Sequence, residues 1–497
     1  MSPNITMSWV LALAPEIGLL VVLFCVLIFD KLFKPSSPRQ VGLFTAWGGV
    51  AVLALTIVLY WLFSEPDPLW TLSESAFWGG MIRNDLVTLV FRLMFLSALI
   101  LTALLSMDVP RLQKIEYYAL LITATIGFSL MAASTDLIMI YVALETASIS
   151  SYLLAGFYSG EGRSSEAGMK YFVYGAFTTA VMLYGMSLLY GITGQTNIYV
   201  IGSVFSGEQT AGVEPLLLLA AVLVVVGFAF KTSIVPYHFW APDVYEGAPT
   251  PFTGFLSTAS KAAGFAVFLR VFLAGTFGPV STQAEWWAML VAMCIITMTL
   301  GNFVAIYQTN IKRLLAYSSI AQAGYALIGL VTLTQDGSGA TLFYLLMYVF
   351  TNIAAFGVII LVSNATGADE IKDLNGLNRR SPFLALVMLF AVLSLGGIPP
   401  TAGFFGKFFL FQSAIDAGLW WLALIGILMA FVGLYYYLNI IKVMYLYRSE
   451  QDDVAIPVSG AAQVGLVIAV VFIIYLGVRA GPAFELTREA AAAFFPG

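Results

Sequence analysis

Long apolar runs separated by short polar segments follow one another along the whole chain. Fourteen of them reach the length of about 18 residues that an α-helix needs to cross a bilayer. The pattern therefore predicts an all-α polytopic membrane protein with about fourteen transmembrane helices. The runs lie near residues 9–29, 41–63, 84–106, 115–133, 136–158, 168–191, 214–239, 252–275, 286–308, 315–334, 340–363, 383–412, 420–447 and 461–480.

Two of the runs contain helix-breaking residues. The seventh includes KTSIVPYHFWAPD (231–243), and the twelfth includes LSLGGIPPTAGFFGK (393–407). Proline removes a backbone donor and its ring clashes with the preceding turn of a helix. We therefore expect helices 7 and 12 to be discontinuous, each with a lysine beside its break.

The two breaks lie five helices apart, which predicts an internal repeat. Helices 4–8 and 9–13 would be its two units, inverted relative to each other because five is odd, as in many ion transporters. This divides the chain into three N-terminal helices (1–110), the first repeat (111–280), the second repeat (281–450), and helix 14 with the tail (451–497).

Basic residues are distributed unequally between alternate loops. With the N-terminus outside, twelve lysines and arginines fall in inside loops and two on the outside. This asymmetry follows the positive-inside rule and predicts that both termini lie outside.

The loops between the predicted helices are too short for a soluble catalytic domain. We expect the longest outer segment (193–215) to form a small hairpin.

Composition excludes several functions. The chain is 60% hydrophobic and 10% charged, against about 25% charged in soluble domains. It has one histidine, two cysteines within apolar runs and no CxxC motif, which argues against a zinc, haem or iron–sulfur site. Neither a GxGxxG segment after a strand nor a P-loop is present, and no basic patch suggests nucleic acid.

Four ionisable residues lie deep in the predicted helices: Glu145, Lys231, Lys261 and Lys407. A charge at the bilayer centre costs about 2.5–3.5 kcal/mol even on the lenient insertion scale, so four such groups indicate a function or partners. Burial lowers the pKa of a lysine by up to about 3–5 units, which permits proton exchange near neutral pH. We interpret the three lysines as proton-exchanging groups and Glu145 as a modulator of Lys231.

Other polar residues in these runs allow two interpretations. His238 is suited to relay protons between Lys231 and Lys261, but it also fits a structural role near Tyr237 and Trp240. The small hydroxyl residues around the four charges fit a hydrated path or helix packing. Arg92 and Arg270 lie near predicted helix ends, where we expect them to reach the interface.

Several of these segments together resemble a known family. The chain looks like the subunit N family of the proton-pumping NADH–quinone oxidoreductase, complex I, whose antiporter-like membrane subunits are similar to Mrp-type sodium/proton antiporter subunits. The resemblance runs from about the third predicted helix to the thirteenth. It rests on LETASISSYLLAGF, EAGMKYFVYGAF, FKTSIVPYHFWAPDVYEGAPTPFTGFLSTASKAAGF, NIKRLLAYSSIAQAGY and GGIPPTAGFFGKFFLF.

The resemblance also assigns roles to residues. It implies that Glu145 is the family's helix 5 glutamate, Lys231 its helix 7 lysine, Lys261 its helix 8 lysine and Lys407 its helix 12 lysine, with His238 the histidine after the helix 7 break. The four charges would form a proton relay.

The resemblance implies partners and a location as well. No cofactor is expected in this chain, while FMN, iron–sulfur clusters and quinone would belong to partner subunits. The expected partners are the other membrane-arm subunits and the lipid bilayer, with no nucleic acid. The expected location is the bacterial plasma membrane, or alternatively a thylakoid membrane, since related complexes there accept ferredoxin.

Three other functions fit parts of the pattern. A sodium/proton antiporter subunit of an Mrp-like system would transport sodium without NADH. A non-transporting scaffold would use its buried charges only to hold helices together. A solute carrier would need a midplane substrate site, for which no aromatic or acidic cage is evident.

Overall fold

The computed structural model describes residues 7–29, 31, 37–62, 78–205, 212–277, 283–449 and 454–495. Over these residues, the regular secondary structure is helical, and extended segments form only isolated bridges. Twelve helices among them are long and apolar enough to cross a membrane. The predicted all-α polytopic membrane protein is thus confirmed, whereas the count of fourteen spans and the inverted repeat stay predictions.

The N-terminal helices and those of the first predicted repeat account for the chain up to residue 274. Among the described residues before residue 110, the α-helices are α1 (Met7–Ala12), α2 (Ala14–Leu27), α4 (Arg39–Leu62) and α5 (Leu86–Ser106). The next are α6 (Ile115–Ala133), α7 (Leu137–Ala155), α8 (Gly162–Thr193), α9 (Ile198–Phe205), α10 (Glu214–Thr232), α11 (Trp240–Gly247), α12 (Thr250–Phe255), the π-helical η5 (Leu256–Ser260), α13 (Lys261–Leu269) and the π-helical η6 (Arg270–Ala274).

The remaining helices contain the second predicted repeat and the C-terminal span. They are α14 (Gln283–Ile306), α15 (Ile311–Val331), α16 (Gln335–Thr366), η7 (Ile371–Leu374), α17 (Leu377–Arg380), α18 (Pro382–Gly396), α19 (Ala402–Asp416), α20 (Trp420–Leu446), α21 (Gly460–Val478) and α22 (Ala480–Ala491). Short 3₁₀ turns lie at Trp78–Gly80, Pro110–Leu112 and Ala492–Phe494. Every predicted run coincides with one helix or with consecutive helical segments.

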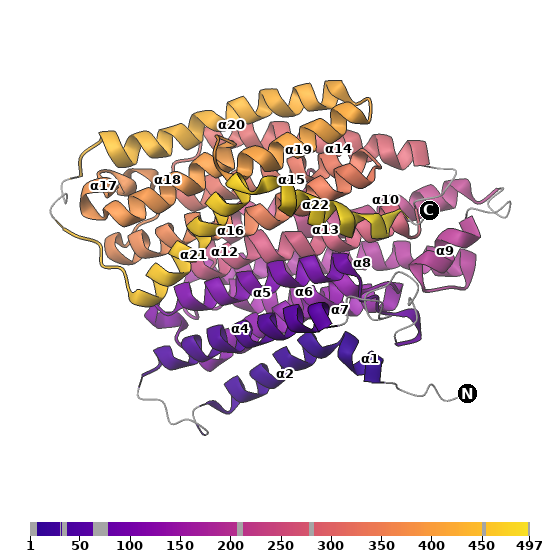
Figure 1. The fold of residues 1–497 in the computed structure, drawn as a ribbon, viewed down its shortest axis with the longest axis horizontal. Helices are drawn as coiled ribbons and strands as arrows, with labels where there is room; N and C mark the ends of the chain where they lie inside the picture. The colour runs from indigo at the N-terminus through magenta and orange to yellow at the C-terminus, as the bar shows by residue number, and fades with distance from the viewer. Residues whose placement is uncertain are drawn as a thin grey trace.

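The long helices lie side by side in one bundle (Figure 1). α2 and α4 form one edge of the view and α20 the other, while α1 and the end of α22 lie at the same end of the bundle. Interior and edge helices differ in burial. Every residue in an apolar 18-residue stretch of the span Thr250–Ala274 is buried inside the protein, and so are 94% of the residues in such a stretch of α15 and of α16, against only 28% in α20. The centre of the bundle is therefore enclosed by other helices of the same chain.

Both expected breaks are present. α10 ends at Thr232, and Ser233 adopts a left-handed conformation (φ 60°) ahead of Pro236. α18 ends at Gly396, and Gly397 (φ 83°) supplies the positive φ that glycine tolerates best. α11 and α19 then resume the two spans after the prolines.

One expectation about a segment between predicted helices is wrong. The segment 193–215, for which the sequence predicts a hairpin, contains helix α9 instead, while residues 206–211 lie outside the described part of the chain. Asn197 accepts hydrogen bonds from the first turn of α9 and starts that helix.

Candidate functional site

Lys231 lies in the last turn of α10, just before the first break. Its side chain is buried (1% exposed), and Nζ donates a hydrogen bond to Oγ of Ser148 on α7 at 3.0 Å. The Phe128 ring centre lies 5.5 Å from the same Nζ. The ammonium therefore has a neutral hydroxyl and an aromatic face as its direct partners.

Glu145 lies one turn before Ser148 on α7, so the two side chains share a face of that helix. The glutamate is half-buried, its Oε1 is buried without a hydrogen-bond partner, and its charge acts on Lys231 electrostatically. Among the described residues, no ion pair within 4.0 Å joins Glu145 to a lysine. The structure thus brings the carboxylate and the amine together without direct contact.

Lys261 is the first residue of α13 and directly follows the π-helical turn η5, within the span Thr250–Ala274. It is 2% exposed, and Nζ donates to the backbone carbonyl of Ser319 on α15 at 2.6 Å. Gly264, one turn later, faces the stem of Lys231, and a Cβ added there would lie 3.3 Å from Cγ of Lys231. Glycine at this position lets the helices of Lys231 and Lys261 approach closely.

Lys407 lies on α19, one turn after the second break. It is 6% exposed, and Nζ donates to the carbonyls of Leu395 (2.9 Å) and Gly396 (3.1 Å) in the last turn of α18. The Tyr325 ring centre is 5.0 Å away. Carbonyls at a helix C-terminus lack intrahelical donors and carry partial negative charge, so this helix end is suited to bind a cation.

A buried amide joins the surroundings of Lys407 to α15, and the sequence analysis did not identify it. Gln322 donates from Nε2 to the Leu395 carbonyl (3.2 Å) and to the Tyr437 hydroxyl (3.0 Å). Its Oε1 accepts a hydrogen bond from the Tyr344 hydroxyl. The sequence feature that could have pointed to this residue is a glutamine within the apolar run at 315–334. Gln322 lies one turn from Ser319, the residue that binds Lys261.

His238 lies in the turn between α10 and α11. It is buried (4% exposed), its Nδ1 has no hydrogen-bond partner, and its ring lies 4.4 Å from that of Phe239. Over the described residues it makes no hydrogen bond to Lys231 or Lys261. Its expected relay role stays a prediction.

Two arginines disagree with the expectation from sequence. Arg92 is 1% and Arg270 0% exposed, so neither reaches an interface. Each is instead held by a buried carboxylate, because the tertiary structure brings an acid from a distant segment to it. We call these two arginines with Glu16 and Asp85 the arginine cluster.

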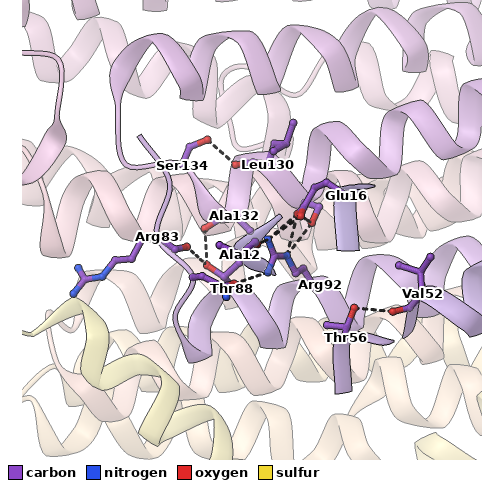
Figure 2. Close-up of polar contacts among 12 residues, drawn as sticks. Ala12, Glu16, Val52, Thr56, Arg83, Thr88, Arg92, Leu130, Ala132 and Ser134 are labelled. Carbon is purple, nitrogen blue, oxygen red and sulfur yellow. Dashed lines mark hydrogen bonds and ion pairs between the residues drawn. The ribbon is translucent and has the colours of Figure 1, made fainter. Parts of the chain in front are cut away.

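Arg92 on α5 is bound by Glu16 of α2. Its Nε and Nη2 each donate to a different Glu16 oxygen at 3.0 Å (Figure 2). Its Nη1 donates to Oδ1 of Asn84 at 2.5 Å. Ser129 of α6 donates a further hydrogen bond to Glu16. In the sequence, the only sign of this contact was that the acidic residue Glu16 lies within the first apolar run. Three helices are thereby joined at one buried point.

Arg270 at the start of η6 is bound by Asp85, the residue that caps α5. The two hydrogen bonds between them measure 2.6 and 2.9 Å, and Nε donates to the Ala132 carbonyl at 2.7 Å. Burial by itself would raise the pKa of Asp85, but the adjacent Arg270 and Arg83 charges and the hydrogen bond from Thr88 hold that pKa below its ordinary value. This acid is therefore ionised at neutral pH.

A partly exposed ion network fixes the helix that follows the first break. Asp243 on α11 accepts from Lys170 of α8 at 2.6 Å and from Arg313 of α15 at 2.8 Å. Arg313 also pairs with Glu246 at 2.9 Å. Since α11 is only two turns long, these pairs hold it between α8 and α15.

Across the described residues, no group of three or more His, Cys, Asp or Glu side chains is arranged to hold a metal ion.

Comparisons with known proteins agree with this arrangement. The family model described as "NADH:quinone oxidoreductase/Mrp antiporter, TM" matches residues 134–433, more than half of the chain. NADH-quinone oxidoreductase subunit N from Moorella thermoacetica is 47% identical over 84% of this chain and 87% of its own. NAD(P)H-quinone oxidoreductase subunit 2 from Trichormus variabilis is 41% identical over 96% and 92%.

A solved structure gives the same result. A chain of respiratory complex I from Thermus thermophilus with bound Aureothin matches with a TM-score of 0.78 and 33% identity, over 95% of this chain and 98% of that one. The chain therefore belongs to the NADH:quinone oxidoreductase/Mrp antiporter family of membrane subunits.

Proposed function

We propose that this chain translocates protons as a membrane-arm subunit of an NADH–quinone oxidoreductase, coupled to quinone reduction elsewhere in the complex. Its relay would consist of Glu145, Lys231, Lys261 and Lys407. One observation carries the proposal: the three lysines are at most 6% exposed, and their direct hydrogen bonds go to neutral oxygens. An ammonium bound only by neutral acceptors is able to give up its proton, and these lysines lie in a chain of this family.

The proposed path crosses the centre of the bundle. Protons enter from the cytoplasmic side towards Lys231, whose charge is stabilised by Glu145. They pass to Lys261, where Gly264 lets the two helices approach, then laterally to Lys407 and outward. Lys261 and Lys407 are linked through α15, since Ser319 binds the former and Gln322 shares the Leu395 carbonyl with the latter.

Partner subunits would supply the redox chemistry. In this proposal FMN, iron–sulfur clusters and quinone belong to other subunits, and this chain contacts the neighbouring membrane-arm subunits and lipid. Both termini lie on the outer side of a bacterial plasma membrane. A thylakoid membrane is the alternative, because one relative is an NAD(P)H-quinone oxidoreductase subunit of Trichormus variabilis.

The test is Lys231→Met in the assembled complex. Proton uptake per electron is measured in inside-out membrane vesicles supplied with NADH, together with the amount of assembled complex. We expect assembly to persist and pumping to fall. Lys442→Met is the control, because Lys442 is an exposed lysine on α20.

Two results would reject the proposal. Unchanged pumping per electron in assembled Lys231→Met would leave the buried lysines a structural role only. Sodium-dependent transport by the wild-type complex in vesicles without NADH would instead indicate a sodium/proton antiporter subunit.

A further inference from the structure

The amide of Gln322 is fixed between two lysines of the proposed relay. It is 3% exposed, and both its donor and its acceptor atoms are engaged by residues of three other helices. The Leu395 carbonyl can only accept a hydrogen bond, so the NH₂ group must face it. An amide does not gain or lose a proton near neutral pH, so Gln322 does not itself carry protons.

The Leu395 carbonyl is the point at which Gln322 meets Lys407. The oxygen accepts from Nζ of Lys407 at 2.9 Å and from Nε2 of Gln322 at 3.2 Å. The two donor groups on this oxygen both carry partial positive charge and repel each other. Each donor therefore weakens the hydrogen bond that the other makes to the oxygen. The amide therefore reduces how strongly this helix end retains an ammonium.

We propose that Gln322 is a positioning residue for Lys407: by sharing the Leu395 carbonyl, it keeps this lysine able to release its proton. The inference rests on the proposed function and deepens it. Tyr344 and Tyr437 hold the amide in its orientation, since one donates to Oε1 and the other accepts from Nε2.

Few titratable groups face Lys407. The helices packed against α19 are α15, α16, α18, α20, α21 and α22, the last through the stacked rings of Phe409 and Phe484. They contribute the phenols of Tyr325, Tyr344 and Tyr437 on this side, while α18 contains no titratable residue and α21 only the half-exposed Tyr475. The charged residues of α22, Glu485, Arg488 and Glu489, are exposed. Among the described residues, no carboxylate lies within 4.0 Å of Lys407. A change in the pH response of Lys407 is therefore not confounded by an adjacent acid.

The test replaces the amide by an apolar side chain of similar length, in Gln322→Met. Proton pumping by the assembled complex is measured in inside-out vesicles from pH 6 to pH 9. We expect pumping at pH 7 to fall several-fold and to recover as the pH rises. The alkaline shift of the profile should be at most about one pH unit, the size expected for one hydrogen bond.

Thr341→Val is the matched control. Thr341 lies one turn before Tyr344 on α16, and its Oγ1 donates to the Ala326 carbonyl of α15 at 2.9 Å. The substitution removes a buried hydrogen bond between the same two helices without touching the amide. Its pH profile should match the wild type. If Gln322→Met does not assemble, Tyr344→Phe frees one side of the amide and should give a smaller alkaline shift.

The outcomes separate this inference from the proposed function. An unchanged profile in Gln322→Met, or an equal shift in Thr341→Val, overturns the role of Gln322. Lys407→Met is measured in parallel. If Lys407→Met pumps normally, the relay itself is rejected at this position; if it loses pumping while Gln322→Met keeps the wild-type profile, only the positioning role fails.

Discussion

The arginine cluster and the row of three lysines bury positive charge in opposite ways. Arg270 is 0% exposed and donates hydrogen bonds to both carboxylate oxygens of Asp85 and to a backbone carbonyl. Lys261 is 2% exposed and has a backbone carbonyl as its direct partner. Burial is nearly equal, so the nature of the partner is the difference between the two regions.

This difference separates a fixed charge from a movable one. A guanidinium keeps its proton under all physiological conditions, and a carboxylate that binds it with two hydrogen bonds makes the pair static. An amine held by neutral oxygens lacks that stabilisation and is able to exchange its proton. We infer that the arginine cluster holds helices together, whereas the lysines perform the proposed transport.

The largest effect expected from this comparison is on stability. Asp85→Asn leaves Arg270 buried without its counter-charge, which costs about 3–5 kcal/mol for a broken buried pair. The melting temperature and the yield of the assembled complex in detergent should both fall, while pumping per electron in the surviving complex stays unchanged. Asp108→Asn, in a pair whose Arg39 is 51% exposed, is the milder control. Reduced pumping per electron in Asp85→Asn would contradict the division of roles.

The same pair predicts the direction of pH dependence. Because the pKa of Asp85 is lower in the folded protein than in the unfolded chain, the pair stabilises the fold above the ordinary aspartate range near pH 4. That contribution disappears only as the pH falls through the lowered pKa. Melting curves of the wild type and Asp85→Asn should therefore differ at pH 7 and converge in strong acid; a constant difference would refute the assignment.

The next largest effect is expected from replacing relay lysines by arginine. Lys231→Arg and Lys407→Arg keep a positive charge but cannot release a proton. Pumping should fall by roughly 10²-fold, the lower range for loss of a proton-transferring group. Proton uptake in vesicles measures this, and Lys442→Arg serves as control. Near-normal pumping in either variant would mean that charge alone suffices there.

Glu145→Gln should have a smaller effect, confined to one end of the lysine row. The variant loses the negative charge that acts on Lys231, while Ser148 still binds the amine. In general, a unit charge at a separation of about 10 Å in an effective dielectric of about 20 is worth roughly one pH unit. The profile of pumping should move by about that amount towards acid. A profile that does not move would show that Glu145 and Lys231 act independently.

The smallest effect is expected at a surface pair. Arg111 and Glu161 lie 2.6 Å apart, but their side chains are 56% and 40% exposed. Exposed pairs contribute about 0–1 kcal/mol. Glu161→Gln should change neither pumping nor, beyond about 1 kcal/mol, the stability measured by melting. A loss of stability as large as that of Asp85→Asn would show that exposure does not determine how much an ion pair contributes to stability.

Much of the fold followed from patterns that are local in sequence. Apolar length predicted where the long helices lie, and Pro236 and Pro400 marked the two breaks, because both signals act over a few residues. The burial of Lys231, Lys261 and Lys407 was also predictable, since each lies well inside an apolar run. The π-helical turn before Lys261 was not, because it depends on how the surrounding helices pack.

The partners of the buried charges could not be predicted in the same way. Glu16 and Arg92 are separated by 76 residues, and Asp85 and Arg270 by 185. Because Arg92 and Arg270 lie near predicted helix ends, the sequence suggested that both reach the membrane interface. In the structure each is instead buried and paired with a carboxylate. Gln322 was missed for the same reason, since its partners lie on three other helices.

The sequence by itself determined that this chain is a membrane protein of many helices, that two helices are broken, and that lysines lie within the apolar core. The length of an apolar run and the position of a proline are local properties of the sequence, so neighbouring residues are enough to predict the helices and their breaks. Only the tertiary structure decided which buried charge meets a carboxylate and which meets a neutral oxygen. That choice depends on contacts between distant helices, and it determines whether a buried cation is fixed in place or able to exchange its proton.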